Sequence, residues 1–141
     1  MNKLPVCVDL NRVLVLALHA FLIWLACGAT MVCGREILGL EAALRVHVIA
    51  APIIAIVVSW IYFSFHAAPP LLTAAVFVSF IAILDAAIAT PVFDRSYAMF
   101  SSILGTWLPF ALIFTATCVV GIAVARHRPR KHADNGSAFH F

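Results

Sequence analysis

Four long apolar stretches dominate this chain of 141 residues. Each is at least about 20 residues long, the length that an α-helix needs to cross the hydrocarbon core of a bilayer. The stretches are continuously apolar, without the alternation of apolar and polar residues that is typical of a membrane β-barrel. We therefore predict an all-α integral membrane protein with spans at approximately residues 10–31, 42–65, 71–93 and 101–125.

The composition indicates that lipid rather than water surrounds most of the chain. It is 65% hydrophobic and only 11% charged, with a mean hydropathy of +1.09. A soluble globule of this length needs more polar surface than that. We expect one transmembrane domain over residues 1–125, with no separate catalytic or nucleic-acid-binding domain. Residues 126–141 form a polar basic tail that we expect to be disordered and cytoplasmic.

Short segments, two of them charged and one marked by a pair of prolines, connect the four stretches. They lie at residues 33–41, around the pair Pro69 and Pro70, and at residues 94–97. Short connections make consecutive helices antiparallel, so we predict an up-down four-helix bundle. Because consecutive elements are usually neighbours, we also expect the second and third spans to be in contact.

The distribution of lysine and arginine predicts the orientation of the spans. One side of the membrane would hold Lys3 and Arg12 together with the basic tail, and the other side holds three arginines that are offset by three acids. Cytoplasmic loops are usually the richer in lysine and arginine. We expect a multi-pass protein of the cell (inner) membrane with both termini in the cytoplasm. The basic cluster of the tail should contact lipid headgroups rather than nucleic acid, through Arg126, Arg128, Arg130 and Lys131.

A single acid, Asp85, falls deep inside the third stretch. A carboxylate in the middle of a span costs on the order of 3 kcal/mol, so its side chain should turn toward protein rather than lipid. Ala82 and Ala89 lie on the same helical face and would let another helix approach closely. His47 in the second span has a similar expected depth, and we predict that it is the partner of Asp85.

The outer ends of the spans carry a group of charged residues. Glu41 and Arg45 have the spacing and order of a favourable i, i+4 ion pair at the start of a helix. The group is either a solvated rim or a vestibule that leads down to His47 and Asp85, and its members are Arg35, Glu36, Glu41, Arg45, Asp94 and Arg95.

Other polar side chains inside the spans need hydrogen-bond partners. Trp24 and Trp107 lie deeper than the usual interfacial position, where an indole N–H requires a partner or a water. We expect four hydroxyl residues to bond to carbonyls of their own helices, namely Ser59, Thr106, Thr115 and Thr117.

The histidines and cysteines predict no metal or cofactor. Haem ligation by two histidines requires imidazoles at the same depth, and we expect His19, His47 and His66 at three different depths. The remaining histidines lie in the tail without metal-ligand spacing. Cys27 and Cys33, six residues apart, would have to leave regular helix to form a disulfide.

Three classes of function remain open. A structural or accessory subunit of a membrane assembly, as a homo-oligomer or in a larger complex, is favoured by the small size and the absence of catalytic motifs. The first alternative is a small oligomeric proton- or cation-linked transporter or channel that uses Asp85 and His47. The second is a membrane-embedded enzyme acting on a quinone or lipid. That enzyme would need a further polar group beside the pair, and the candidates are Glu41, Arg45 and Trp107.

Overall fold

The computed structural model describes residues 10–88 and 103–128, and the regular structure in these ranges is helical. Four helices are long and apolar enough to cross a membrane, which confirms the predicted all-α four-helix fold and makes the chain a multi-pass membrane protein. A π-helical segment, η3, leads directly into the last helix. The elements are α1 (Leu10–Leu38), α2 (Leu40–Phe65), α3 (Pro70–Leu84), η3 (Ile103–Trp107) and α4 (Leu108–His127).

The first two helices form a hairpin with a single residue, Gly39, between them. Its φ of 82° lies in the left-handed region, which glycine adopts without the steric cost of a side chain. The Gly39 N–H donates to the Arg35 carbonyl at 3.2 Å, and the Gly39 carbonyl accepts from the Ala43 N–H at 3.0 Å. Helix α1 therefore continues to Leu38, through charged residues that we expected in the connection. Arginine and glutamate are good helix formers, so nothing before Gly39 ends the helix.

Small residues bring α2 close to its neighbours. The buried positions from Ala43 to Ser59 of α2 recur every fourth residue, at Ala43, His47, Ala51, Ala55 and Ser59. A row with this spacing follows one helical face, and small side chains let another backbone approach it. A Cβ added to Gly34 of α1 would lie only 3.0 Å from the Ala43 Cβ.

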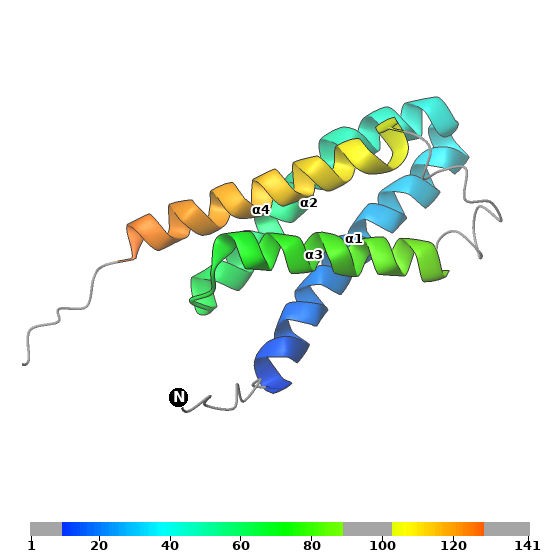
Figure 1. The fold of residues 1–141 in the computed structure, drawn as a ribbon. Coiled ribbons are helices and arrows are strands. Elements are labelled where there is room, and N and C mark those ends of the chain that lie inside the picture. The colour runs from blue at the N-terminus through cyan, green and yellow to red at the C-terminus, as the bar shows by residue number, and fades with distance from the viewer. Residues whose placement is uncertain (1–9, 89–102, 129–141) are drawn as a thin grey trace, which may run out of the picture.

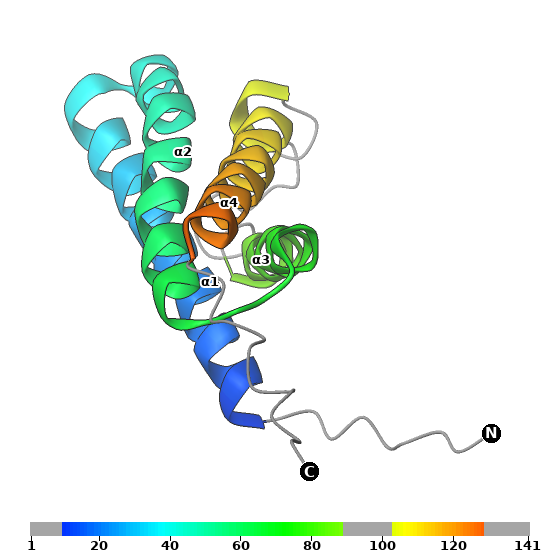
Figure 2. The same ribbon diagram turned by 90° about the vertical axis from the view of Figure 1, so that its left-hand side faces the viewer.

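The helices are arranged in a ring with the order α1, α2, α4, α3. Helices α1 and α4 each pack against both α2 and α3. Consecutive helices run in opposite directions (Figure 1), and Figure 2 shows α4 between α2 and α3. We predicted that the second and third spans are in contact. Within the described ranges α2 and α3 lie diagonally across the bundle, and their contact is between side chains, with the Tyr62 and Phe77 rings edge-on at 5.8 Å.

Gly121 lets α4 lie close to both α2 and α3. It faces Phe63, near the end of α2, and Pro70, the first residue of α3. A Cβ at this position would lie 2.7 Å from both the Phe63 Cζ and the Pro70 Cβ. The absence of a side chain thus lets the α4 backbone fit between the end of one helix and the start of the next.

The distribution of large side chains is that expected of a protein in lipid. The inner face of the bundle includes several alanines together with Ile23, Phe77 and Ile113. Large aliphatic residues point outward instead, among them Leu18, Leu25, Ile49, Val57 and Val119. Helices in lipid gain little from burying leucine against one another and associate through small residues and polar contacts.

Candidate functional site

Asp85 faces helix α1. It follows Phe77 and Ile81, both buried, at successive intervals of four residues on α3, so it belongs to the same inward face. The Trp24 indole Nε1–H donates a hydrogen bond of 2.8 Å to the Asp85 Oδ1. Asp85 is half-buried and stands where the regular helix of α3 changes to a π-helical turn at residues 85–88. The side chain therefore turns toward protein, as the cost of a lipid-facing carboxyl group predicts.

His47 also faces α1, at a point nearer to the C-terminal end of that helix. Its Nδ1 lies 3.3 Å from the Thr30 Oγ1, while the Thr30 hydroxyl donates to the Cys27 carbonyl at 2.7 Å. Because that hydroxyl has a single hydrogen, which the Cys27 carbonyl receives, the imidazole must be the donor in the second bond. The geometry thus assigns the proton of a neutral His47 to Nδ1.

The direct pair that we predicted between Asp85 and His47 is not formed. The two residues bind different points of a polar row on α1 that consists of Trp24, Cys27 and Thr30, which we call the α1 polar row. Its members are three residues apart, so each adjoins the next on the helix surface, while Trp24 toward α3 and Thr30 toward α2 are about 120° apart around the axis. Cys27, in the middle, is buried. The prediction failed because α2 and α3 lie diagonally across the bundle, so that His47 and Asp85 each meet α1 instead of each other.

A second buried polar contact joins α2 to α4. The Ser59 hydroxyl donates to the Thr117 Oγ1 at 3.0 Å, and both residues are fully buried. We expected each of them to bond within its own helix, as the Thr115 hydroxyl does with the Ala111 carbonyl. Ser59 instead bonds across the interface, because the small-residue face of α2 brings α4 within hydroxyl reach.

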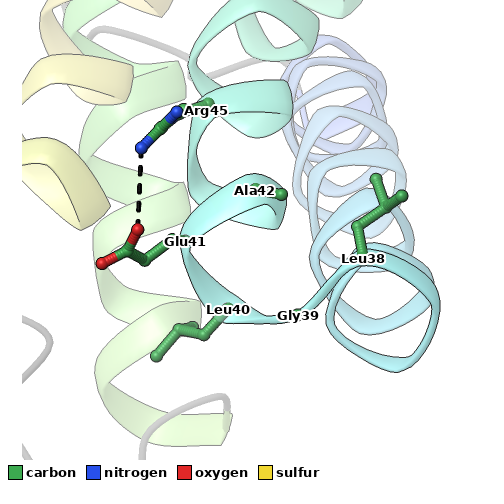
Figure 3. Close-up of a pocket in the computed structure, with 6 residues that line it drawn as sticks. All are labelled: Leu38, Gly39, Leu40, Glu41, Ala42 and Arg45. Carbon is green, nitrogen blue, oxygen red and sulfur yellow. Dashed lines mark ion pairs between the residues drawn. The ribbon is translucent and has the colours of Figure 1, made fainter.

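Part of the predicted charged group at the outer ends of the spans lies within the described residues. Glu41 and Arg45 form the predicted i, i+4 ion pair at 3.6 Å, with side chains that are 88% and 75% exposed. They line a shallow groove of about 440 Å³ with Leu38, Gly39, Leu40 and Ala42 (Figure 3). Neither His47 nor Asp85 lines this groove. Asp94 and Arg95 lie outside the described residues.

At the opposite end of the bundle, Arg128 connects α4 to α2. Its Nη2 donates to the Phe63 carbonyl at 2.6 Å and approaches the Ser64 carbonyl at 3.4 Å. These carbonyls belong to the last turn of α2, where a cation also interacts favourably with the helix dipole. Arg126 is exposed in the last turn of α4. Arg130 and Lys131 lie outside the described residues.

Two histidines come together at this end around Tyr62. The His19 ring meets the Tyr62 ring edge-on with centroids 5.3 Å apart, and His66 stacks on it at 5.0 Å. Each imidazole has its Nδ1 within hydrogen-bond reach of the carbonyl four residues earlier, at 2.8 Å for His19 and 3.2 Å for His66. The sequence placed these histidines further apart in depth, because it assigned α1 a shorter helix with a different midpoint.

The cysteines of the described ranges are free. Cys27 is buried, Cys33 is exposed and Cys118 is half-buried. Across residues 10–88 and 103–128, no three histidine, cysteine or acidic side chains are grouped closely enough to hold a metal ion.

Trp24 and Thr30 are the site residues that the sequence did not assign to Asp85 and His47. A signal for Trp24 was present, because a deeply placed indole requires an acceptor. Thr30 carried no such signal, since a threonine in a span usually bonds to its own helix, as its hydroxyl also does here.

Comparison of the chain with protein-family models, with curated proteins and with solved structures finds no match.

Proposed function

We propose that this protein is a structural or accessory subunit of a membrane assembly. The observation that carries the proposal is that the interior polar side chains bond to one another across helix interfaces. Asp85 bonds to Trp24, His47 to Thr30 and Ser59 to Thr117, each across a pair of helices. In the described part of the chain no buried side-chain nitrogen or oxygen lacks a hydrogen-bond partner. Groups that are satisfied in this way hold helices in register.

The outer surface supports the same proposal. Large apolar side chains remain exposed on every helix, so lipid or a neighbouring subunit must cover them. The partner would be a second copy of the chain or another membrane protein. We further propose that the protein lies in the cell (inner) membrane with both termini in the cytoplasm, on the strength of the lysine and arginine distribution.

Cys33 offers a test of this orientation. It is exposed near the end of α1 that would lie outside. In a variant that retains only Cys33, a membrane-impermeant maleimide should label right-side-out membrane vesicles. A matched variant that retains only Cys7, which precedes α1 in the sequence, should react only after the membrane is permeabilised. The opposite labelling pattern would reverse the proposed orientation.

A small proton- or cation-linked transporter is the second candidate. The observation that favours it is the α1 polar row, because Asp85 and His47 contact α1 within two turns of each other, with Cys27 between their contact points. Titratable groups inside a membrane are functional candidates by default.

Asp85→Asn separates the two candidates. Asparagine keeps an oxygen that can accept from Trp24 but removes the titratable group, so a structural subunit should tolerate the change. We expect the variant to assemble into a complex of wild-type size on a native gel and to show wild-type proton and cation flux in proteoliposomes. If wild-type protein supports a flux that Asp85→Asn abolishes at unchanged thermal stability, the transporter is correct and the accessory subunit is not.

A further inference from the structure

A groove of about 820 Å³ lies where α4 ends and α3 begins. Its lining residues are Pro70, Ile122, Ala125, Arg126 and Arg128. Both ribbon views place the end of α4 at the same end of the bundle as the start of α3 (Figures 1 and 2). The groove thus combines an apolar floor with two guanidinium groups, and none of its lining residues is acidic.

The two arginines differ in how they are held. Arg126 follows Ile122 by four residues on α4, so its charge stands directly beyond the apolar floor on one helical face. Arg128 is fixed by its bonds to the Phe63 and Ser64 carbonyls. Carbonyl oxygens carry no net charge, so these bonds position the Arg128 cation without neutralising it.

Two further exposed leucines lie close to the groove in the sequence. Leu71 and Leu72, which follow Pro70 at the start of α3, are 67% and 61% exposed. An occupant with an anionic group at one end and a hydrocarbon chain at the other would match both parts of this surface. A soluble anion would use only the arginines.

We propose that the groove binds one anionic glycerophospholipid. Its phosphate lies against Arg126 and Arg128, and an acyl chain lies on Ile122 and Ala125. This deepens the proposed function, because it rests on the membrane setting in which this end of the bundle meets the headgroups of the cytoplasmic leaflet. Phosphate pairs well with the planar fork of arginine, and basic pockets between helices are the usual sites of such lipids.

Native mass spectrometry of the protein in an uncharged detergent tests the proposal. The probes are phosphatidylglycerol and phosphatidylcholine with identical acyl chains, titrated into wild type, Arg126→Gln and Arg45→Gln. Arg45→Gln is the matched control, since it removes one exposed arginine at the other end of the bundle. Wild type should prefer phosphatidylglycerol, and Arg126→Gln should weaken its binding about fivefold, which corresponds to about 1 kcal/mol per basic residue. Arg45→Gln should bind as wild type does.

Several outcomes would overturn the proposal. These are equal binding of the two lipids by wild type, equal losses in Arg126→Gln and Arg45→Gln, or displacement of the lipid by millimolar inorganic phosphate, which would indicate a soluble anion. The wild-type comparison requires no variant to fold. Binding in detergent depends on neither orientation nor assembly, so failure here leaves the proposed function standing, and reversed cysteine labelling leaves the groove standing.

Discussion

Gly121→Leu should strongly destabilise the folded bundle, whereas Gly28→Leu should not. A Cβ at Gly121 already lies 2.7 Å from Phe63 and Pro70. Phe63 is buried and Pro70 is a rigid ring at a helix start, so neither moves aside cheaply. Overpacking a close interface costs about 1 to 3 kcal/mol, and a whole leucine side chain should reach the upper end of that range. The measurement is thermal denaturation in detergent micelles, followed by circular dichroism.

Gly28 is the matched control for this prediction. It lies in the interior of α1, is exposed, and a Cβ added to it would meet nothing within 4 Å. A leucine there gains helix propensity and points toward lipid, so its midpoint should equal or exceed that of wild type. Gly121→Ala should fall between wild type and Gly121→Leu. Equal midpoints for Gly121→Leu and Gly28→Leu would show that α4 does not fit between α2 and α3.

Removing the Trp24–Asp85 hydrogen bond should have the second largest effect. Trp24→Phe keeps an aromatic ring but deletes the donor that lies 2.8 Å from Asp85. We expect the free energy of unfolding to fall by about 1 to 2 kcal/mol, since hydrogen bonds between membrane helices are modest and those to carboxyl groups are among the stronger ones. Reversible unfolding in sodium dodecyl sulfate measures this free energy.

A double-mutant cycle isolates the bond itself. Asp85 makes a further interaction besides the one with Trp24, so Asp85→Leu alone would report more than one contact. Combined with Trp24→Phe, it should give a coupling energy of about 1 kcal/mol. Trp60→Phe removes an exposed indole on α2 and should give no coupling to Asp85→Leu. Zero coupling for Trp24 as well would mean that this bond contributes nothing to α1–α3 packing.

The helices themselves were predictable from local sequence. A run of about 20 apolar residues specifies a membrane helix because every backbone polar group must be satisfied within it. The ion pair of Glu41 with Arg45 was predictable for a similar reason, since four-residue spacing alone places the two side chains together. The inward direction of Asp85 also followed from the energetic cost of exposing it to lipid.

The partners of Asp85 and His47 were not predictable in the same way. The depth of each residue followed from its position in a span, but two residues at equal depth meet only if their helices are adjacent. Adjacency depends on which faces interlock, and here Gly121 lets α4 pass between α2 and α3. Asp85 therefore contacts Trp24, and His47 contacts Thr30, both on α1.

By itself, then, the amino-acid sequence determined that this is a membrane protein, that its helices alternate in direction, and that Asp85, the acid inside a span, must face protein. Those properties depend on composition and on spacing within one helix. Only the tertiary structure decided the order of the helices around the bundle, and with it the α1 polar row, the Ser59–Thr117 contact and the groove beside Arg126. The physical reason is that close packing between helices depends on a few small residues whose partners lie far away in the chain.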